Sequence, residues 1–379
     1  MEFSRNVNGK LLRCGYTTGT CAAAAAKAAC IALLGGMPVG QVSIGTPKGI
    51  VLMLDVLNLM QEGDGVSCAV RKDSGDDPDV TNGALVYARV KRSTEGIQID
   101  GGEGVGRVTK PGLDQPVGAA AINSVPRKMI TKELHEAAGR YGYKGGFSVM
   151  ISVPSGEELA RRTFNPRMGI EGGISVIGTT GIVEPMSNQA MADTVRLELK
   201  QLWASGVHEV LLTPGNYGET FARESLRLLQ SNHITCSNFI GDAIDGAVEL
   251  GFTQILLVGH IGKLVKLGIG IINTHSSFGD GRMETLTACA LEAGADIPLL
   301  QGIAHSVTTD AALTLIWEGG LLKKTMDELG NRIDTCLHRR VPESVTIGHV
   351  SFTSAKPLCG VLTKSANADA LMDIWRIKG

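Results

Sequence analysis

The strongest constraint on the fold is an alternation of short apolar stretches, glycine-bearing turns and helical patterns that begins near residue 169. The apolar stretches are rich in β-branched residues, as strands are when helices cover both faces of a sheet. Strands that alternate with helices at this spacing form βαβ units, in which consecutive strands run parallel. The C-terminal part of the chain is therefore predicted to be a Rossmann-like parallel α/β domain.

The predicted elements of this region can be assigned along the chain. The strands span residues 174–177, 210–213, 234–239 and 255–258. A helix follows the turn after each strand. The first spans residues 187–204, and the other three end near residues 230, 250 and 272. Each strand runs into a turn with glycine or polar residues. Four such turns are therefore expected along one edge of the sheet, where ligands of parallel sheets bind.

The first half of the chain has a different pattern. A helix is expected over residues 21–34, with Thr17, Thr18 or Thr20 as its cap and Gly35 near its end. Six strands are expected after it, at residues 42–46, 50–59, 66–72, 85–91, 97–100 and 147–153. One further helix is expected at residues 131–141, before the last of these strands. The turn residues between them favour an antiparallel or mixed sheet. We therefore expect an α+β domain over residues 1–168 and an α/β domain over residues 169–379.

Composition excludes several classes of function. A formal net charge of -2 gives no general attraction to nucleic acid or an anionic membrane, and 4% aromatic residues argue against a base-stacking surface. The eight cysteines include no C-x-x-C pair and are expected to be free thiols in a reducing cytoplasm. The polar N-terminus lacks a signal peptide, and the apolar run at residues 21–34 is shorter than the ~20 residues of a membrane span.

The turns at the strand ends are the candidate cofactor-binding elements. Glycine lets backbone N–H groups approach a ligand, and the start of a helix favours negative charge. The residues expected to bind a nucleotide-like cofactor are Gly178, Thr179, Thr180, Gly181, Gly215, Asn216, Tyr217, Gly218, Gly241 and Gly259. None of the turns matches a dinucleotide fingerprint or a Walker loop, which argues against a kinase or NTPase.

Three side chains near these turns are candidates for proton transfer. His260 directly follows an apolar strand, and an imidazole with a pKa of roughly 6.5 exchanges protons close to neutral pH. Asp242 opens the third helix and His275 follows the fourth. Both could act in catalysis, or simply cap and complement a helix terminus.

Charged clusters lie outside these turns. Arg161, Arg162 and Arg167 could clamp carboxylates, because arginine binds a carboxylate bidentately, although exposed helix charges give the same pattern. Lys263, in the first turn of the fourth helix, is a further candidate cation. The loop at residues 73–79 concentrates aspartates that could hold a hard cation, but a solvated Asp-Pro turn is the commoner outcome.

Several long runs occur in a fixed order between Gly15 and Glu284. They are GYTTGTCAAAAAKAA, KDSGDDPDVTNGA, GVGRVTKPGL, VPSGEELARRTFNPRMGIEGGISVIGTTGIVEPMS, TPGNYG, IGDAIDGAVELGF, LLVGHIGKLVKLG and NTHS. Together they resemble the CbiD family, the cobalt-precorrin-5B C1-methyltransferases of the anaerobic route to cobalamin. The sequence departs from that pattern after NTHS, where the family leads us to expect an arginine near Ser277.

The resemblance implies transfer of a methyl group from S-adenosylmethionine to ring carbon C1 of cobalt-precorrin-5B, giving cobalt-precorrin-6A. His260, Asp242 or His275 would remove or relay a proton. The acetate and propionate groups of the substrate would meet the arginine cluster and Lys263. Cobalt would arrive within the substrate, so no metal site of the protein is required. The sequence leaves open whether the chain forms a homo-oligomer.

Two other functions are compatible with the same edge of the sheet. A nicotinamide-dependent oxidoreductase would bind NAD(P)H there, but the dinucleotide fingerprint and its acidic ribose partner are missing. A non-catalytic tetrapyrrole carrier would bind its ligand tightly whether or not S-adenosylmethionine is present.

Overall fold

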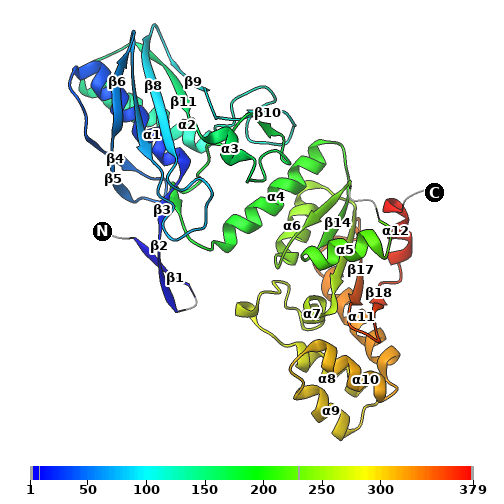
Figure 1. Cartoon of the computed structure of the whole chain (residues 1–379). Coiled ribbons are helices and arrows are strands. Elements are labelled where there is room, and N and C mark those ends of the chain that lie inside the picture. Colours follow the sequence, from blue (N-terminus) through cyan, green and yellow to red (C-terminus); the bar gives the residue numbers. More distant parts are fainter. Residues whose placement is uncertain (1–2, 8, 229–230, 377–379) are drawn as a thin grey trace. The chain divides into compact units, whose positions relative to one another are not determined.

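The structure, a computed structural model, describes residues 3–7, 9–228 and 231–376 of the 379-residue chain. The fold is mixed α/β and contains two compact units, Met1–Ser187 and Asn188–Gly379 (Figure 1). The boundary between them lies beyond Met168, because the segment after Met168 pairs with strands of the N-terminal unit.

A five-stranded mixed sheet forms the base of the N-terminal unit. Its strand order is β6-β7-β8-β11-β9, and every neighbouring pair is antiparallel except β11 and β9. The strands are β6 (Leu57–Glu62), β7 (Gly65–Arg71), β8 (Leu85–Ser93), β9 (Ile97–Gly101) and β11 (Gly146–Ser152). Alternate residues of β8, namely Val86, Ala88 and Val90, are buried, as expected for a sheet whose core face is covered by helices.

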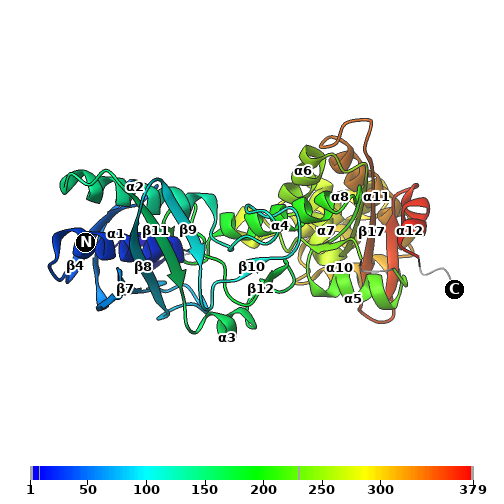
Figure 2. The same cartoon turned by 90° about the horizontal axis from the view of Figure 1, so that it is seen from above.

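Two helices cover that face, α1 (Thr18–Gly35) and α2 (Ser124–Arg140) (Figure 2). α1 packs against β7, β8 and α2, and its alanines are buried on all sides because their small side chains let the helix lie close to its neighbours. Among the described residues, α1 is the one helix long and apolar enough to cross a membrane by length and composition. In this structure 78% of that stretch is buried within the unit.

A buried ion pair connects the two helices. Lys27 Nζ of α1 lies 2.6 Å from Glu133 Oε2 of α2 and donates to the Ser43 carbonyl at 2.7 Å. The two side chains are only 6% and 3% exposed. Ser43 belongs to β4 (Gln41–Gly45), which pairs with β5 (Val51–Asp55), so one ammonium group holds two helices and a hairpin together.

Shorter elements complete the N-terminal unit. They are β1 (Ser4–Val7), β2 (Lys10–Arg13), β3 (Gly15–Tyr16), β10 (Arg107–Val108), α3 (Gly156–Ala160), β12 (Ile170–Glu171) and β13 (Ile182–Val183). β12 pairs with β10 and β13 pairs with β3, which joins the segment after Met168 to this unit.

The C-terminal unit is built on a second five-stranded sheet. Its order is β15-β14-β16-β17-β18, in which the first four strands are parallel and β18 is antiparallel. The strands are β14 (Glu209–Thr213), β15 (His233–Thr235), β16 (Gln254–His260), β17 (Thr346–Thr353) and β18 (Gly360–Lys364). The parallel pairing agrees with the alternation of strands and helices in the sequence.

Helices cover both faces of this sheet (Figure 1). α5 (Asn216–Glu224) and α12 (Ala368–Trp375) pack on one face, and α6 (Ile240–Leu250) and α11 (Leu322–His338) pack on the other. The remaining helical elements are α4 (Asn188–Ala204), α7 (Ile261–Leu264), η1 (Val265–Ile269), η2 (Ser276–Phe278), α8 (Arg282–Glu292), α9 (Ile297–Ala304) and α10 (Thr309–Glu318).

Two predicted elements are wrong. Residues 174–177 do not form a strand of the parallel sheet; Ile174 and Val176 make isolated bridges within the N-terminal unit, where both side chains enter its core. The helix expected to reach residue 272 is instead the short α7 followed by a 3₁₀ turn, which ends at Gly270 in a left-handed conformation. The helix after β14 is also shorter than predicted: α5 ends at Glu224, whereas the predicted end, Gln230, lies outside the described residues.

The buried ion pair leads to a prediction about stability. Replacing Lys27 with Met should lower the free energy of unfolding by about 3–5 kcal/mol, because Glu133 is left as an uncompensated buried charge. The double variant Lys27→Met/Glu133→Leu should recover most of that loss. Urea unfolding followed by circular dichroism measures both effects.

A matched control lies on the same helix. Lys132 and Glu136 of α2 form an exposed pair, so Lys132→Met should change the free energy of unfolding by less than about 1 kcal/mol. If Lys27→Met and Lys27→Met/Glu133→Leu lowered the free energy of unfolding equally, the loss in the single variant could not come from an unpaired Glu133 charge.

Candidate functional site

The carboxyl ends of the parallel strands form the candidate site. β14 connects to β15 on one side of the sheet, whereas β17 lies on the other side of β16. The strand order therefore reverses between β14 and β16, and ligands of open parallel sheets bind in the crevice at such a point. Thr213 and His260 are the last residues of the two strands.

The turn after β14 contains one glycine that leaves space for a ligand and one that does not. Gly215 precedes α5 with a φ of 117°, and a Cβ atom placed on it would meet nothing closer than Lys263 Nζ, at 3.6 Å. A Cβ on Gly218 would lie 2.7 Å from the Val258 carbonyl, so Gly218 is required for packing against β16. The Tyr217 side chain, between them, is 77% exposed.

His260 is held by an aromatic neighbour and by a helix terminus. Its ring stands edge-on to Phe352 of β17 at 5.4 Å between centroids, and the Tyr217 ring lies 6.4 Å away. Nδ1 of His260 accepts the Gly262 N–H at 3.1 Å and so caps α7. The neutral ring therefore carries its hydrogen on Nε2. Burial lowers the pKa of His260, and the charge of Asp310 partly opposes this shift.

Lys263 supplies a cation beside the turn after β14. Its ammonium group donates to the Ser237 carbonyl at 3.3 Å and lies next to Gly215. Burial lowers the pKa of Lys263, and the neighbouring Lys266 adds to this effect. Such a half-buried ammonium group can bind an anionic ligand at the crevice.

Asp242 lies in the first turn of α6, after β15. It is half-buried and lines a cavity of about 500 Å³. Phe239, Ile271, Asn273 and Phe278 contribute to the same cavity. The preceding residue, Gly241, has a packing role instead, because a Cβ there would lie 2.5 Å from the Ile272 side chain.

His275 also serves as a helix cap. Its Nδ1 accepts the Ser277 N–H at 3.2 Å and lies 2.7 Å from the Ser277 hydroxyl. The neighbouring Thr274 donates its N–H to the Asn238 carbonyl, which holds this loop beside the loop after β15. His275 therefore belongs to the same end of the sheet, with Nδ1 occupied.

One predicted part of the site lies elsewhere. The turn from Gly178 to Gly181, which also contains Thr179 and Thr180, was expected at the edge of the parallel sheet, and this placement is wrong. The turn lies against the start of α1 in the N-terminal unit. The Gly19 N–H donates to the Ile177 carbonyl, and the Thr20 hydroxyl donates to the Gly181 carbonyl. A Cβ on Gly178 would meet the Thr17 hydroxyl at 2.1 Å, so this glycine allows close packing.

The arginine cluster lies on the surface of the N-terminal unit. Arg161, Arg162 and Arg167 are exposed and follow α3, which ends at Ala160. Arg161 forms an i,i+4 pair with Glu157 at 3.4 Å, which is the geometry of ordinary helix charges. The other two leave guanidinium surface available to an anion.

The acidic loop has protein partners for its carboxylates. Arg13 binds Asp73 with two hydrogen bonds of 2.5 and 2.8 Å and holds the pKa of that carboxyl below its usual range. Asp79 pairs with the buried Lys72, and Asp77 accepts the Met186 N–H at 3.2 Å. Among the described residues, no three His, Cys, Asp or Glu side chains gather as a metal-binding group.

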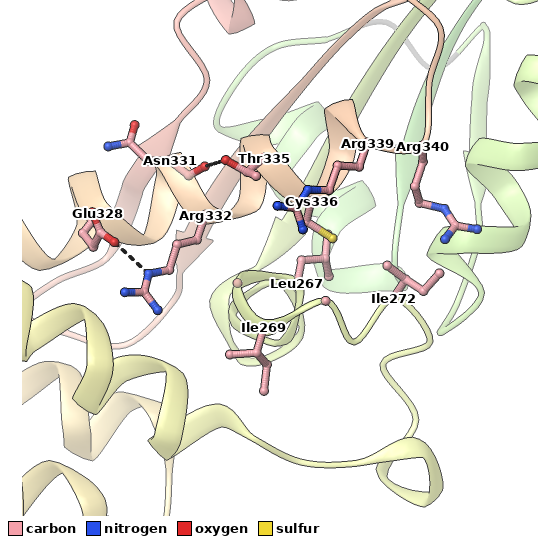
Figure 3. A pocket seen from close by; sticks show the side chains of 12 residues that line it. Leu267, Ile269, Ile272, Glu328, Asn331, Arg332, Thr335, Cys336, Arg339 and Arg340 are labelled. Atoms are coloured by element: carbon pink, nitrogen blue, oxygen red, sulfur yellow. Dashed lines mark hydrogen bonds and ion pairs between the residues drawn. The ribbon is translucent and has the colours of Figure 1, made fainter.

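Sequence reasoning missed a cavity of about 680 Å³ between η1 and α11 (Figure 3). Leu267, Ile269 and Ile272 supply apolar lining. The α11 side presents Glu328, Asn331, Arg332, Thr335, Cys336 and Arg339, and Arg340 follows the helix. This spacing of three and four residues marks one helix face, so the sequence contained a signal for it.

Comparisons with known proteins identify the family. The CbiD family model matches residues 5–185, and the model of the CbiD C-terminal domain matches residues 273–361. The cobalt-precorrin-5B C(1)-methyltransferase of Ruminiclostridium cellulolyticum is 47% identical over 346 residues, which cover 91% of this chain and 90% of that protein. The Alkaliphilus metalliredigens protein of the same name is 44% identical over 98% of this chain and 97% of its own length.

A solved structure is also similar. The crystal structure of the cobalamin biosynthesis protein (cbiD) from Archaeoglobus fulgidus matches at 31% identity and a TM-score of 0.40. The match covers 72% of this chain and 84% of that one. The two family models and the nearly full-length relatives lead to one conclusion: the chain belongs to the CbiD family.

Proposed function

We propose that the chain is a cytoplasmic enzyme that transfers a methyl group from S-adenosylmethionine to C1 of cobalt-precorrin-5B, giving cobalt-precorrin-6A in anaerobic cobalamin biosynthesis. The observation that carries this proposal is identity of 44–48% to curated methyltransferases of that name over most of the chain. The matches cover nearly the whole chain and therefore include both units, which supports the same reaction for this chain as for those relatives.

The C-terminal unit is the proposed Rossmann-like donor-binding domain. The open turn at Gly215, the exposed Tyr217 and the cation of Lys263 meet where the strand order reverses. A molecule with a carboxylate and an aromatic base has suitable partners there. When bound, S-adenosylmethionine supplies an electrophilic methyl group, so the residues of the chain mainly align the reactants and exclude water.

Methyl transfer moves the positive charge of the sulfonium to the macrocycle, which becomes neutral again by losing a proton. Asp242 is the proposed acceptor of that proton among the three candidates. His260 and His275 both use Nδ1 to accept a backbone N–H, so each neutral ring has its hydrogen on Nε2 and acts there as a donor. The Asp242 carboxylate accepts hydrogen bonds only and faces a cavity. His260 is better suited to orient a ligand through Nε2–H.

Cations of the chain are proposed to hold the carboxylates of the macrocycle. Arg161, Arg162 and Arg167 present exposed guanidinium groups on the N-terminal unit. Lys263 lies at the crevice beside the donor and would meet a macrocycle carboxylate only where the two reactants adjoin. Cobalt is part of the substrate in this proposal and needs no ligand from the chain.

Methyl transfer tests the proposed function directly. Incubated without oxygen with cobalt-precorrin-5B and methyl-labelled S-adenosylmethionine, the protein should move the label to the ring, as detected by mass spectrometry. Absence of transfer would contradict the proposal. Tight macrocycle binding without transfer would favour a carrier, and NAD(P)H binding by fluorescence would favour an oxidoreductase.

The choice of Asp242 makes a separate prediction. Asp242→Asn should lower turnover by roughly 100-fold or more, because an amide cannot accept the proton. Affinity for S-adenosylhomocysteine, measured by calorimetry, should change little. Glu249→Gln on the exposed side of the same helix is the matched control. Turnover of Asp242→Asn close to that of the control would exclude the aspartate as the base.

His260 gives a prediction about pH. Protonation of Nδ1 would break the cap of α7, which carries Lys263, so turnover should fall as the pH is lowered. Because burial lowers the pKa of His260, the inflection should lie below the ordinary value of roughly 6.5.

His260→Asn is the matched variant for the pH profile. Its amide oxygen takes the position of Nδ1 and keeps the cap but does not titrate in this range. This variant should lack the acidic inflection, and persistence of the same inflection would assign it to another group.

A further inference from the structure

The cavity between η1 and α11 has the composition of an anion-binding site. Its lining contains three arginines, Arg332, Arg339 and Arg340, and one carboxylate, Glu328. Arg332 pairs with Glu328 at 2.7 Å, and Arg340 pairs with Asp245 of α6. Arg339 is exposed and has no carboxylate partner among the described residues. The lining therefore keeps a net positive charge that an anion would neutralise.

The cavity is also partly apolar. Figure 3 shows Cys336 and Leu267 near its middle, with Arg332 toward one end and Arg340 toward the other. Burial raises the pKa of Cys336 despite the nearby Arg340 and Arg339, so this thiol is neutral and contributes apolar surface. Arginines around an apolar floor match a ligand with an apolar body and carboxylates at its edge.

The position of the cavity relates it to the rest of the site. Gly270 and Ile272 line both this cavity and the cavity of about 500 Å³ that contains Asp242. The two cavities therefore lie on either side of one short segment of chain. A ligand held by the arginines would lie next to the space that the proposed proton acceptor faces.

We propose that the cavity between η1 and α11 is a subsite that binds carboxylate side chains and an apolar edge of the tetrapyrrole substrate. The choice of a tetrapyrrole rests on the proposed function. At about 680 Å³ the cavity is within the size range of small-molecule sites and takes part of such a molecule, with guanidinium groups binding carboxylates bidentately.

Binding of a stable corrinoid tests this subsite apart from catalysis. Dicyanocobyrinic acid, which has free carboxylates, should bind the full-length protein in equilibrium dialysis, whereas its neutral heptamethyl ester should bind weakly. Arg339→Ala should weaken binding of the acid by roughly tenfold, and Arg332→Ala/Arg339→Ala should weaken it further. Lys323→Ala, an exposed cation at the other end of α11, is the matched control and should bind normally.

Labelling of Cys336 locates the ligand. The substitution Cys359→Ser removes the exposed cysteine. Six of the remaining cysteines are buried and Cys336 is half-buried, so N-ethylmaleimide should modify mainly Cys336. The acid should slow this labelling in the parent protein, and Arg339→Ala should remove the protection.

Three results would overturn the subsite: equal binding of acid and ester, unchanged binding in both arginine variants, or full displacement of the acid by an equal concentration of inorganic phosphate. Failure of methyl transfer by the wild-type protein would instead overturn the proposed function. Charge-dependent protection of Cys336 can be measured in either case, so the two failures are distinguishable.

Discussion

Parallel pairing of β14 with β16 is the constraint on which the rest of the C-terminal unit depends. The register from Glu209 opposite Gln254 to Leu212 opposite Leu257 makes the two strands end at the same edge of the sheet. Thr213, Gly215, His260 and the loop before α6 meet there only because of this pairing. The strand order reverses at the same place, so the chain leaves a crevice that neither crossover connection fills.

Helix capping decides the chemistry available to the histidines at this edge. His260 caps α7 and His275 caps η2, each by accepting a backbone N–H at Nδ1. A histidine that caps a helix has a fixed ring orientation, but its Nδ1 is no longer available to accept a proton or a hydrogen bond from a ligand. The same geometry that orients the two histidines makes them donors at Nε2, which is why we propose Asp242 as the proton acceptor.

The family and most elements could be predicted from the sequence. The alternation of strands and helices predicted β14, α6 and β16. The long sequence runs between Gly15 and Glu284 predicted membership of the CbiD family, which the comparisons confirm. The turn at Gly178 was misplaced because a glycine needed for close packing against Thr17 has the same sequence pattern as one that binds a ligand. Only tertiary contacts separate these two uses.

The arginine face of α11 was missed for a related reason. Arg332 and Arg339 stand seven residues apart, a spacing that places them on one helix face, but the sequence does not show that η1 lies opposite and closes a cavity. Nor does it show that the Lys27 ammonium within an alanine-rich helix meets Glu133 of α2. Long-range partners of charged residues were the part that pattern alone could not supply.

A crystal structure with bound S-adenosylhomocysteine tests the central claim, that the donor binds at the carboxyl edge of the parallel sheet. Density for the ligand is expected beyond the ends of β14 and β16, in contact with the Gly215 turn and Lys263. Density confined to the loops around the start of α1 in the N-terminal unit would contradict it.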